Sequence, residues 1–214
     1  MGSIEALSLA MGTAWTSGIN LYATVAALGL AGRLEMIQLP QSLEVLTNPI
    51  VIAVACIMYA IEFFADKIPY VDNGWDVLHT FIRVPAGAIL AARSLGDMSP
   101  GLEFAALLGG GSIALAAHGT KATTRLAINS SPEPFSNWIA SFVEDVAVLG
   151  AIWIIFNHPW LMLALVFVFL ALMIWIVPKI FRWAKRGFTM LRNRLGGIKP
   201  GQATTSTPLN TTTR

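Results

Sequence analysis

Charged side chains recur at helical spacing inside apolar stretches of this chain. Asp76, His79 and Arg83 fall at i, i+3 and i+7 within one stretch, and Glu62 and Asp66 lie four residues apart in the stretch before it. Residues at these spacings share one face of an α-helix. Carboxylate, imidazole and guanidinium groups on such faces can carry protons, attract an anion or pair with one another. The pattern therefore predicts either a pathway for a polar solute or a static charge network.

Other stretches carry matching polar faces. His118, Lys121 and Arg125 form a basic face, while Ser17 and Asn20 belong to an uncharged polar face near the start of the chain. The uncharged face has an alternative interpretation as hydrogen-bonding contacts between helices. The residues that we predict to line a polar pathway or binding site are Ser17, Asn20, Glu62, Asp66, Asp76, His79, Arg83, His118, Lys121, Arg125 and Glu144.

The cost of charge in a membrane decides how these faces must be arranged. A charged side chain at the middle of a bilayer costs about 2.5 to 3.5 kcal/mol even on the lenient insertion scale. We therefore expect the acidic second and fifth helices to face the basic third and fourth. Alternatively, several of these residues lie in the membrane interface and never enter hydrocarbon, namely Lys67, Asp72, Asp76, Lys121, Arg125 and Glu133.

The composition identifies the elements that must position these groups. Of the 214 residues, 55% are hydrophobic and only 12% are charged, with a mean hydropathy of +0.65. A typical soluble domain has about 25% charged residues, so a soluble globular domain is excluded. We predict an all-α polytopic membrane bundle of about six transmembrane helices. The expected spans are residues 4–32, 49–64, 72 or 75 to 92, 100–128, 138–156 and 159–178.

The C-terminal part has a different charge from the rest. Eight of the fourteen Lys and Arg residues lie at or beyond Lys179, and no Asp or Glu follows Asp145. We predict a transmembrane bundle over 1–178, a basic amphipathic juxtamembrane helix over 179–196 that binds anionic lipid, and a disordered tail over 197–214. The basic excess indicates a lipid surface rather than a nucleic acid. It predicts a multi-pass membrane protein with both termini in the cytoplasm.

No enzyme signature accompanies these patterns. The chain lacks a phosphate-binding loop, a nucleophile elbow and the HExxH pattern, and no cofactor is expected. Three histidines without a close HxxxH pair do not predict a metal site. The single cysteine, Cys56, excludes an intrachain disulfide, and we expect it to be a small buried hydrophobic residue.

Three segments together resemble a known family. They are TSGINLYATVAALGLAGR, EFFADKIPYVD followed by WDVLHTFIR, and HGTKATTRLAINSSPEPFSNW. They are similar to small bacterial membrane proteins grouped as the domain of unknown function DUF4126, over about residues 10 to 183. Where the family pattern favours proline after Arg83, this chain has Val84 followed by Pro85. The resemblance implies a protein of the bacterial inner membrane and no particular activity.

Three functional interpretations remain open from the sequence. The leading one is a channel or secondary transporter for a small polar or anionic solute, with proton coupling as an option. The second is a non-catalytic membrane scaffold or lipid-binding protein with a static charge network. The third is a membrane enzyme that acts on a lipid headgroup with His79 or His118 as acid or base. The small size and the glycines at 109–111 are compatible with a homo-oligomer.

Overall fold

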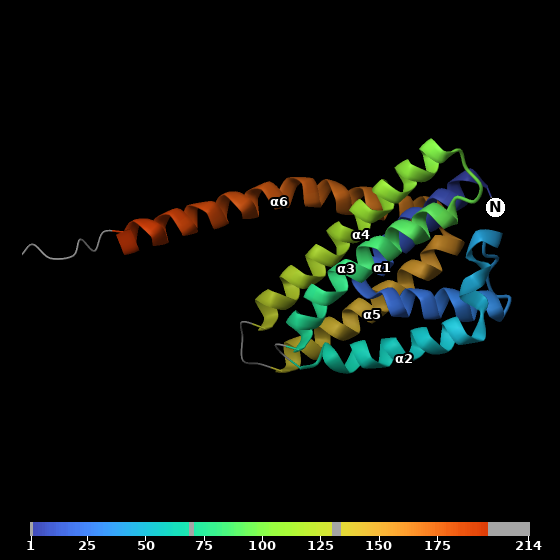
Figure 1. Ribbon diagram of the computed structural model, residues 1–214, viewed down its shortest axis with the longest axis horizontal. Coiled ribbons are helices and arrows are strands. Elements are labelled where there is room, and N and C mark those ends of the chain that lie inside the picture. Colours follow the sequence, from blue (N-terminus) through green and yellow to red (C-terminus); the bar gives the residue numbers. More distant parts are fainter. Residues whose placement is uncertain (1, 69–70, 130–133, 197–214) are drawn as a thin grey trace, which may run out of the picture. The chain divides into compact units, whose positions relative to one another are not determined.

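A computed structural model describes residues 2–68, 71–129 and 134–196 of the chain, and all its regular elements are helices (Figure 1). The all-α membrane bundle expected from the sequence is confirmed. The elements are α1 (Ser3–Arg33), the short 3-10 helix η1 (Gln41–Thr47), α2 (Pro49–Ala65), α3 (Val71–Ser94), α4 (Pro100–Asn129), α5 (Pro134–Asn157) and α6 (Pro159–Gly196).

Local capping signals place the helix starts. The Asn48 side chain accepts a hydrogen bond from the backbone N–H of Ile50 at 2.8 Å, and Pro49 occupies the first position of α2. Proline suits that position because its missing N–H has no partner within the helix. The same arrangement of a polar residue before proline starts α4 at Pro100. The expected boundaries of these helices therefore agree with the structure within one residue.

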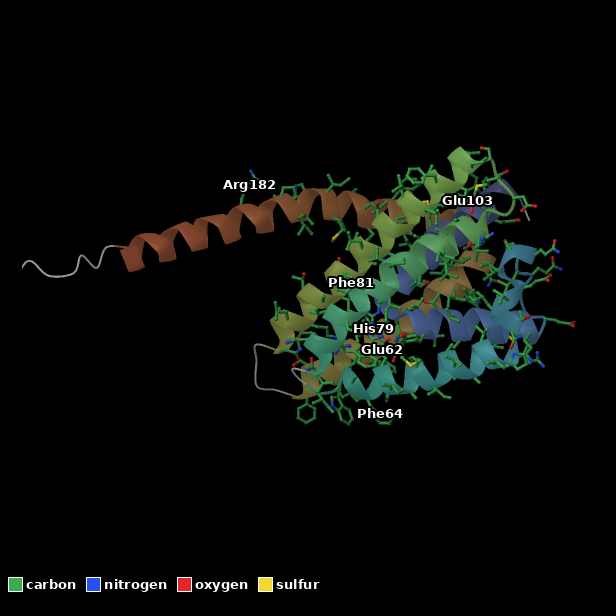
Figure 2. The ribbon with its side chains drawn as sticks, viewed as in Figure 1. Glu62, Phe64, His79, Phe81, Glu103 and Arg182 are labelled. Atoms are coloured by element: carbon green, nitrogen blue, oxygen red, sulfur yellow. The ribbon has the colours of Figure 1, made fainter. Side chains whose placement is uncertain are left out.

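The distribution of side chains is that of a membrane protein. Large apolar residues lie outside, with Phe81 and Phe135 each 78% exposed, while charged residues such as Arg83 are completely buried. Figure 2 shows Phe64 and Phe81 on the outer surface and Glu62 inside the bundle. Hydrocarbon chains, rather than water, suit such an outer surface. Cys56 is also exposed, because it lies on an outward-facing side of α2. The prediction that Cys56 is buried was therefore wrong.

Several described helices have the length and apolar character of a membrane span. Three qualify separately: Pro100–Asn129, Phe135–Asn157 and Pro159–Lys179. A fourth span results if η1 and α2, which are bent by 65° at their junction, are counted together. Helix α3 is not among them because its charged residues lower its mean hydropathy.

Helix α1 is broken, although the sequence predicted one span over residues 4–32. Asn20 has φ −147° and ψ 98°, which is extended rather than helical backbone. Its side-chain oxygen accepts a hydrogen bond from the N–H of Ala23 at 2.9 Å and so caps the second half of the helix. The preceding residues, TSGI, include a glycine and two residues with weak helix propensity, which favours a break there.

The second half of α1 runs back toward the end of the bundle at which the first half begins. Thr13 lies 3.5 Å from Ser94 at the end of α3, and Tyr22 lies 3.1 Å from His79 near its beginning. After the second half, η1 returns to the end of α3, where the hydroxyl of Ser42 donates to the carbonyl of Arg93. Helix α1 therefore enters and leaves at the same end of the bundle and reverses at Asn20 (Figure 1).

Small residues let α1, α3 and α4 approach closely. A Cβ atom at Gly18 would lie 2.7 Å from the Cβ of Ala117, and one at Gly87 would lie 2.6 Å from the hydroxyl oxygen of Ser17. Such small-residue contacts are common between membrane helices. They bring the polar faces of three helices within bonding distance.

The chain forms two compact units, residues 1–171 and 172–214. Helix α6 continues through Pro178 to Gly196, whereas the sequence predicted a separate helix over 179–196. In the second unit, the ammonium group of Lys179 lies 3.0 Å from the ring centre of Trp175, and Arg182 is exposed (Figure 2). The expected disorder of residues 197–214 concerns residues outside those described.

Candidate functional site

The bundle contains a cluster of six ionic side chains from four helices, five of which are buried. We call it the charge cluster, and its members are Glu62, Asp66, Arg83, Lys121, Arg125 and Glu144. Glu62 on α2 joins two of the bases, because its Oε1 lies 2.7 Å from Nη2 of Arg83 and 3.2 Å from Nζ of Lys121. Figure 2 shows Glu62 inside the bundle.

Lys121 and Arg125 extend the charge cluster to α5. Lys121 lies 3.1 Å from Oδ2 of Asp66 and 3.3 Å from Oε2 of Glu144. Arg125 binds Glu144 with two parallel hydrogen bonds of 2.9 and 2.7 Å, and its Nη2 lies 3.3 Å from Asp66. Such paired arginine–carboxylate bonds are stronger and more directional than single ones. As the charges predicted, α2 and α5 supply acids to bases on α3 and α4.

The charge cluster is almost completely enclosed. The exposed fraction of its side chains is at most 3%, except for Glu144 at 16%. Three carboxylates and three bases balance each other, and each carboxylate contacts two bases. This balance offsets the cost of burying charge, which would otherwise oppose insertion.

Two further carboxylates lie beside the charge cluster on α3. Oδ1 of Asp76 is 3.3 Å from Nη1 of Arg83, and Asp76 has no other basic partner among the described residues. Oδ2 of Asp72 accepts a hydrogen bond from the side-chain amide of Asn129 at 2.8 Å. Both residues are at most 3% exposed. With these two residues, the carboxylates of the site outnumber its bases.

Hydrogen bonds define the state of His118. Nη1 of Arg83 lies 3.1 Å from its Nδ1, and because a guanidinium group can only donate, Nδ1 must accept. The other nitrogen, Nε2, lies 2.8 Å from the hydroxyl of Thr80 and 3.0 Å from the carbonyl of Asp76, so it carries the proton. His118 is therefore neutral in this arrangement, and it contributes no charge to the site.

His79 connects the site to the break in α1. Its Nδ1 lies 2.8 Å from the carbonyl of Trp75, which can only accept, so this nitrogen carries a proton. In the neutral ring Nε2 accepts from the hydroxyl of Tyr22 at 3.1 Å. Tyr22 follows Asn20 by two residues. The reversal point of α1 is thus bonded directly to the polar face of α3.

A second bond joins the break in α1 to α5. The side-chain amide of Asn20 donates to Oδ1 of Asp145 at 3.3 Å. Ser17, in contrast, donates to the carbonyl of Ala14 at 2.9 Å and packs against Gly87, away from the ion pairs. Asn20 therefore contributes to the site directly, and Ser17 contributes to helix packing.

Two cavities reach the site from opposite faces of α4. One, of about 240 Å³ between α3 and α4, is lined by Asp76, Thr80 and Asn73 among others. The other, of about 260 Å³ between α1, α4 and α5, is lined by Lys121 and Glu144 among others. The ion pairs of Arg83, Glu62 and Lys121 connect Asp76 to Glu144. A chain of charged groups therefore runs between the two cavities.

Most of the predicted pathway residues meet in one place. They include all six residues of the charge cluster, and Asp76 and His118 contact its Arg83. Asn20 and His79 bond to Asp145 and Tyr22 instead, and Ser17 packs between helices. Asp72, Asp76, Lys121 and Arg125 are buried inside the bundle, and their location at the depth of the membrane interface stays an alternative prediction. Lys67 lies between α2 and α3, where partial burial lowers its pKa below the ordinary range. Glu133 lies outside the described residues.

Sequence reasoning missed several neutral members of the site. Tyr22 and Asn129 gave no signal by spacing, because each bonds to a residue from a distant part of the chain. Asn137, in contrast, shares a helical face with Glu144 by its spacing. The amide of Asn137 donates to Oδ1 of Asn129 at 2.6 Å, which in turn bonds to Asp72. Asp72 lies four residues before Asp76, so the sequence already places both on one helical face.

Comparison with known families supports the resemblance drawn from the sequence. A family model described as a domain of unknown function, DUF4126, matches residues 7–179. The chain belongs to the DUF4126 family. No curated protein and no solved structure matches it. Within the described part of this DUF4126 protein, no group of three or more His, Cys, Asp or Glu residues is arranged to hold a metal ion.

Proposed function

We propose that the protein is a channel or secondary transporter for a small polar solute, coupled to protons. The observation that carries the proposal is the broken helix α1, whose reversal point bonds to a buried charged site. Transporters bind substrate where discontinuous helices expose backbone polar groups near the middle of the membrane. Irregular backbone at that depth is tolerated only where it is buried in protein or lines a cavity.

The charges favour a neutral or cationic solute, or a proton, over an anion. Arg83, Lys121 and Arg125 each have carboxylate partners, so an anion would have to displace one of them. The described carboxylates of the site outnumber its bases. An anionic solute, which the sequence also allowed, therefore has less support from these contacts.

The proposal includes an orientation in the bacterial inner membrane. The basic segment after Lys179 favours the cytoplasm, where it would bind anionic lipid. If α3 crosses the membrane together with the four candidate spans, five crossings separate the start of α2 from the end of α6. The α2–α3 connection would then lie in the cytoplasm and the N-terminus outside. The sequence-based expectation of two cytoplasmic termini assumed that α1 crosses the membrane, and a hairpin changes that expectation. A homo-oligomer remains compatible with Gly109, the exposed residue of the glycine-rich part of α4.

A flux measurement in proteoliposomes tests the proposal. Vesicles with an internal pH-sensitive dye receive an imposed pH gradient, followed by glycine or glycerol as the trial solute. We expect Glu62→Gln and Arg83→Gln to abolish protein-dependent flux while the protein still inserts. Glu103→Gln, at an exposed residue in the first turn of α4, is the matched control and should retain flux. Flux that survives both site substitutions refutes the site assignment.

The enclosed ion pairs favour a second candidate, a membrane scaffold or lipid-binding protein. All three bases of the charge cluster have at most 1% side-chain exposure, as expected of a static network. Cysteine labelling separates the two candidates, because a transport path is hydrated and a static network is dry. In a Cys56→Ala background, Asn20→Cys should react with a water-soluble thiol reagent if the protein transports, and should remain unreacted if the protein is a scaffold.

A further inference from the structure

We propose that Asp72 and Asp76 form a carboxyl pair that holds one proton at neutral pH. The inference deepens the proposed function, on which it rests, because it assigns the coupling proton to two named residues. Its physical basis is a comparison between the bases of the site and the carboxylates that surround them.

The bases of the charge cluster are already matched by other acids. Glu62, Asp66 and Glu144 each contact two bases, and the six groups together are neutral. Arg83 has its shortest ion pair with Glu62, at 2.7 Å, compared with 3.3 Å to Asp76. Asp76 is therefore the most weakly paired carboxylate that contacts a base in this site.

Asp72 has an even poorer environment for a negative charge. None of the ion pairs among the described residues includes it, and its side-chain hydrogen bond comes from the neutral amide of Asn129. Asp72 is completely buried, and its Oδ1 has no hydrogen-bond partner. Oδ2 of Asp76 also has none. A protonated carboxyl group would turn one of these orphaned oxygens into a donor.

The positive charges that act on the pair are those of Arg83, Lys121 and Arg125, which also pair with the carboxylates of the charge cluster. Asp72 and Asp76 lie one helical turn apart on α3, and like charges at that spacing repel. The ionisable groups facing them are Asp66 and Glu62 on α2, Arg83 and His79 on α3, and His118, Lys121 and Arg125 on α4. His118 is neutral because Arg83 donates to it. The bases among these groups are those already balanced by the charge cluster.

A buried surplus of negative charge is costly, and a bound cation or a proton reduces it. The described residues contain no arrangement of ligands for a metal ion. Two carboxylates that share a buried site commonly share one proton, since they cannot both ionise at low cost. The proton has a path to the pair, because Asp76 lines the 240 Å³ cavity together with Asn73 and Thr80.

Infrared spectroscopy of the full chain in lipid tests the proton directly. A protonated carboxyl group absorbs apart from an ionised carboxylate, and its band shifts in heavy water. We expect the wild type to show this band at pH 7 and to lose it at alkaline pH. The double variant Asp72→Asn and Asp76→Asn should lack the band, whereas Glu103→Gln, a control at an exposed carboxylate in the first turn of α4, should retain it.

The outcomes separate this inference from the transport proposal. A band that is absent from the wild type at pH 7, or that persists in the Asp72→Asn and Asp76→Asn double variant, overturns the inference. A band that forms only after sodium is removed also overturns it, because a cation would then occupy the pair. The measurement requires no flux, so a protein that transports nothing can still show the shared proton. Loss of flux with an intact band would instead reject the transport function alone.

Discussion

Replacing Glu62 by glutamine should destabilise the bundle strongly. The substitution keeps the shape of the side chain and removes one negative charge from a site where Arg83 lies at 2.7 Å and Lys121 at 3.2 Å. Lys121 keeps Asp66 and Glu144, while Arg83 keeps only Asp76 at 3.3 Å. Arg83 would therefore be the poorly compensated charge in the variant.

The magnitude follows from the burial of both partners. Glu62 and Arg83 are 0% exposed, and breaking a buried ion pair by removing one partner costs about 3 to 5 kcal/mol. At about 1.4 kcal/mol per tenfold change, that is roughly a hundredfold to a few thousandfold in the unfolding equilibrium. Glu103→Gln, at an exposed residue, should change the free energy of unfolding by less than about 0.5 kcal/mol.

Unfolding in lipid nanodiscs or mild detergent, followed by tryptophan fluorescence, measures the difference. The double variant Glu62→Gln and Arg83→Gln restores the balance of charge, so we expect it to lose less stability than the two single variants added together. If Glu62→Gln matches Glu103→Gln, or if the two single effects simply add, then Glu62 and Arg83 do not stabilise one another and the reasoning fails.

Two further predictions concern the packing and the break of α1. Gly87→Ala should lower the unfolding temperature, because its Cβ would lie 2.6 Å from the hydroxyl of Ser17. Gly74→Ala, with no atom within 4 Å of the new Cβ, should not lower it. Equal effects of the two substitutions in a thermal scan would contradict the close approach of the helices at Gly87. Asn20→Ala should cost about 1 kcal/mol through the lost cap of the second half-helix, measured by the same unfolding assay, and an unchanged stability would show that the cap is dispensable.

The pattern of residues was enough to predict the class of protein and most helix boundaries. Asn48 before Pro49 and Ser99 before Pro100 are local signals, so they act without information from the rest of the chain. The spacing of Asp76, His79 and Arg83 likewise places three polar groups on one face, because helical geometry alone decides that. The need to neutralise buried charge then predicted that acidic and basic helices would face each other.

The sequence by itself therefore determined an all-α membrane bundle with charged faces turned inward. Only the tertiary structure decided which polar groups pair. Lys121 bonds to Glu62, which is 59 residues away in the sequence, and Asn20 bonds to Asp145, which is 125 residues away. The break at Asn20 is equally a tertiary property, because weak helix propensity permits it and distant polar partners stabilise it. Periodicity indicates the face of the helix on which a side chain lies, but the packing of the other helices decides which groups that side chain contacts. For this reason the sequence could not show that Asp72 has no basic partner among the described residues.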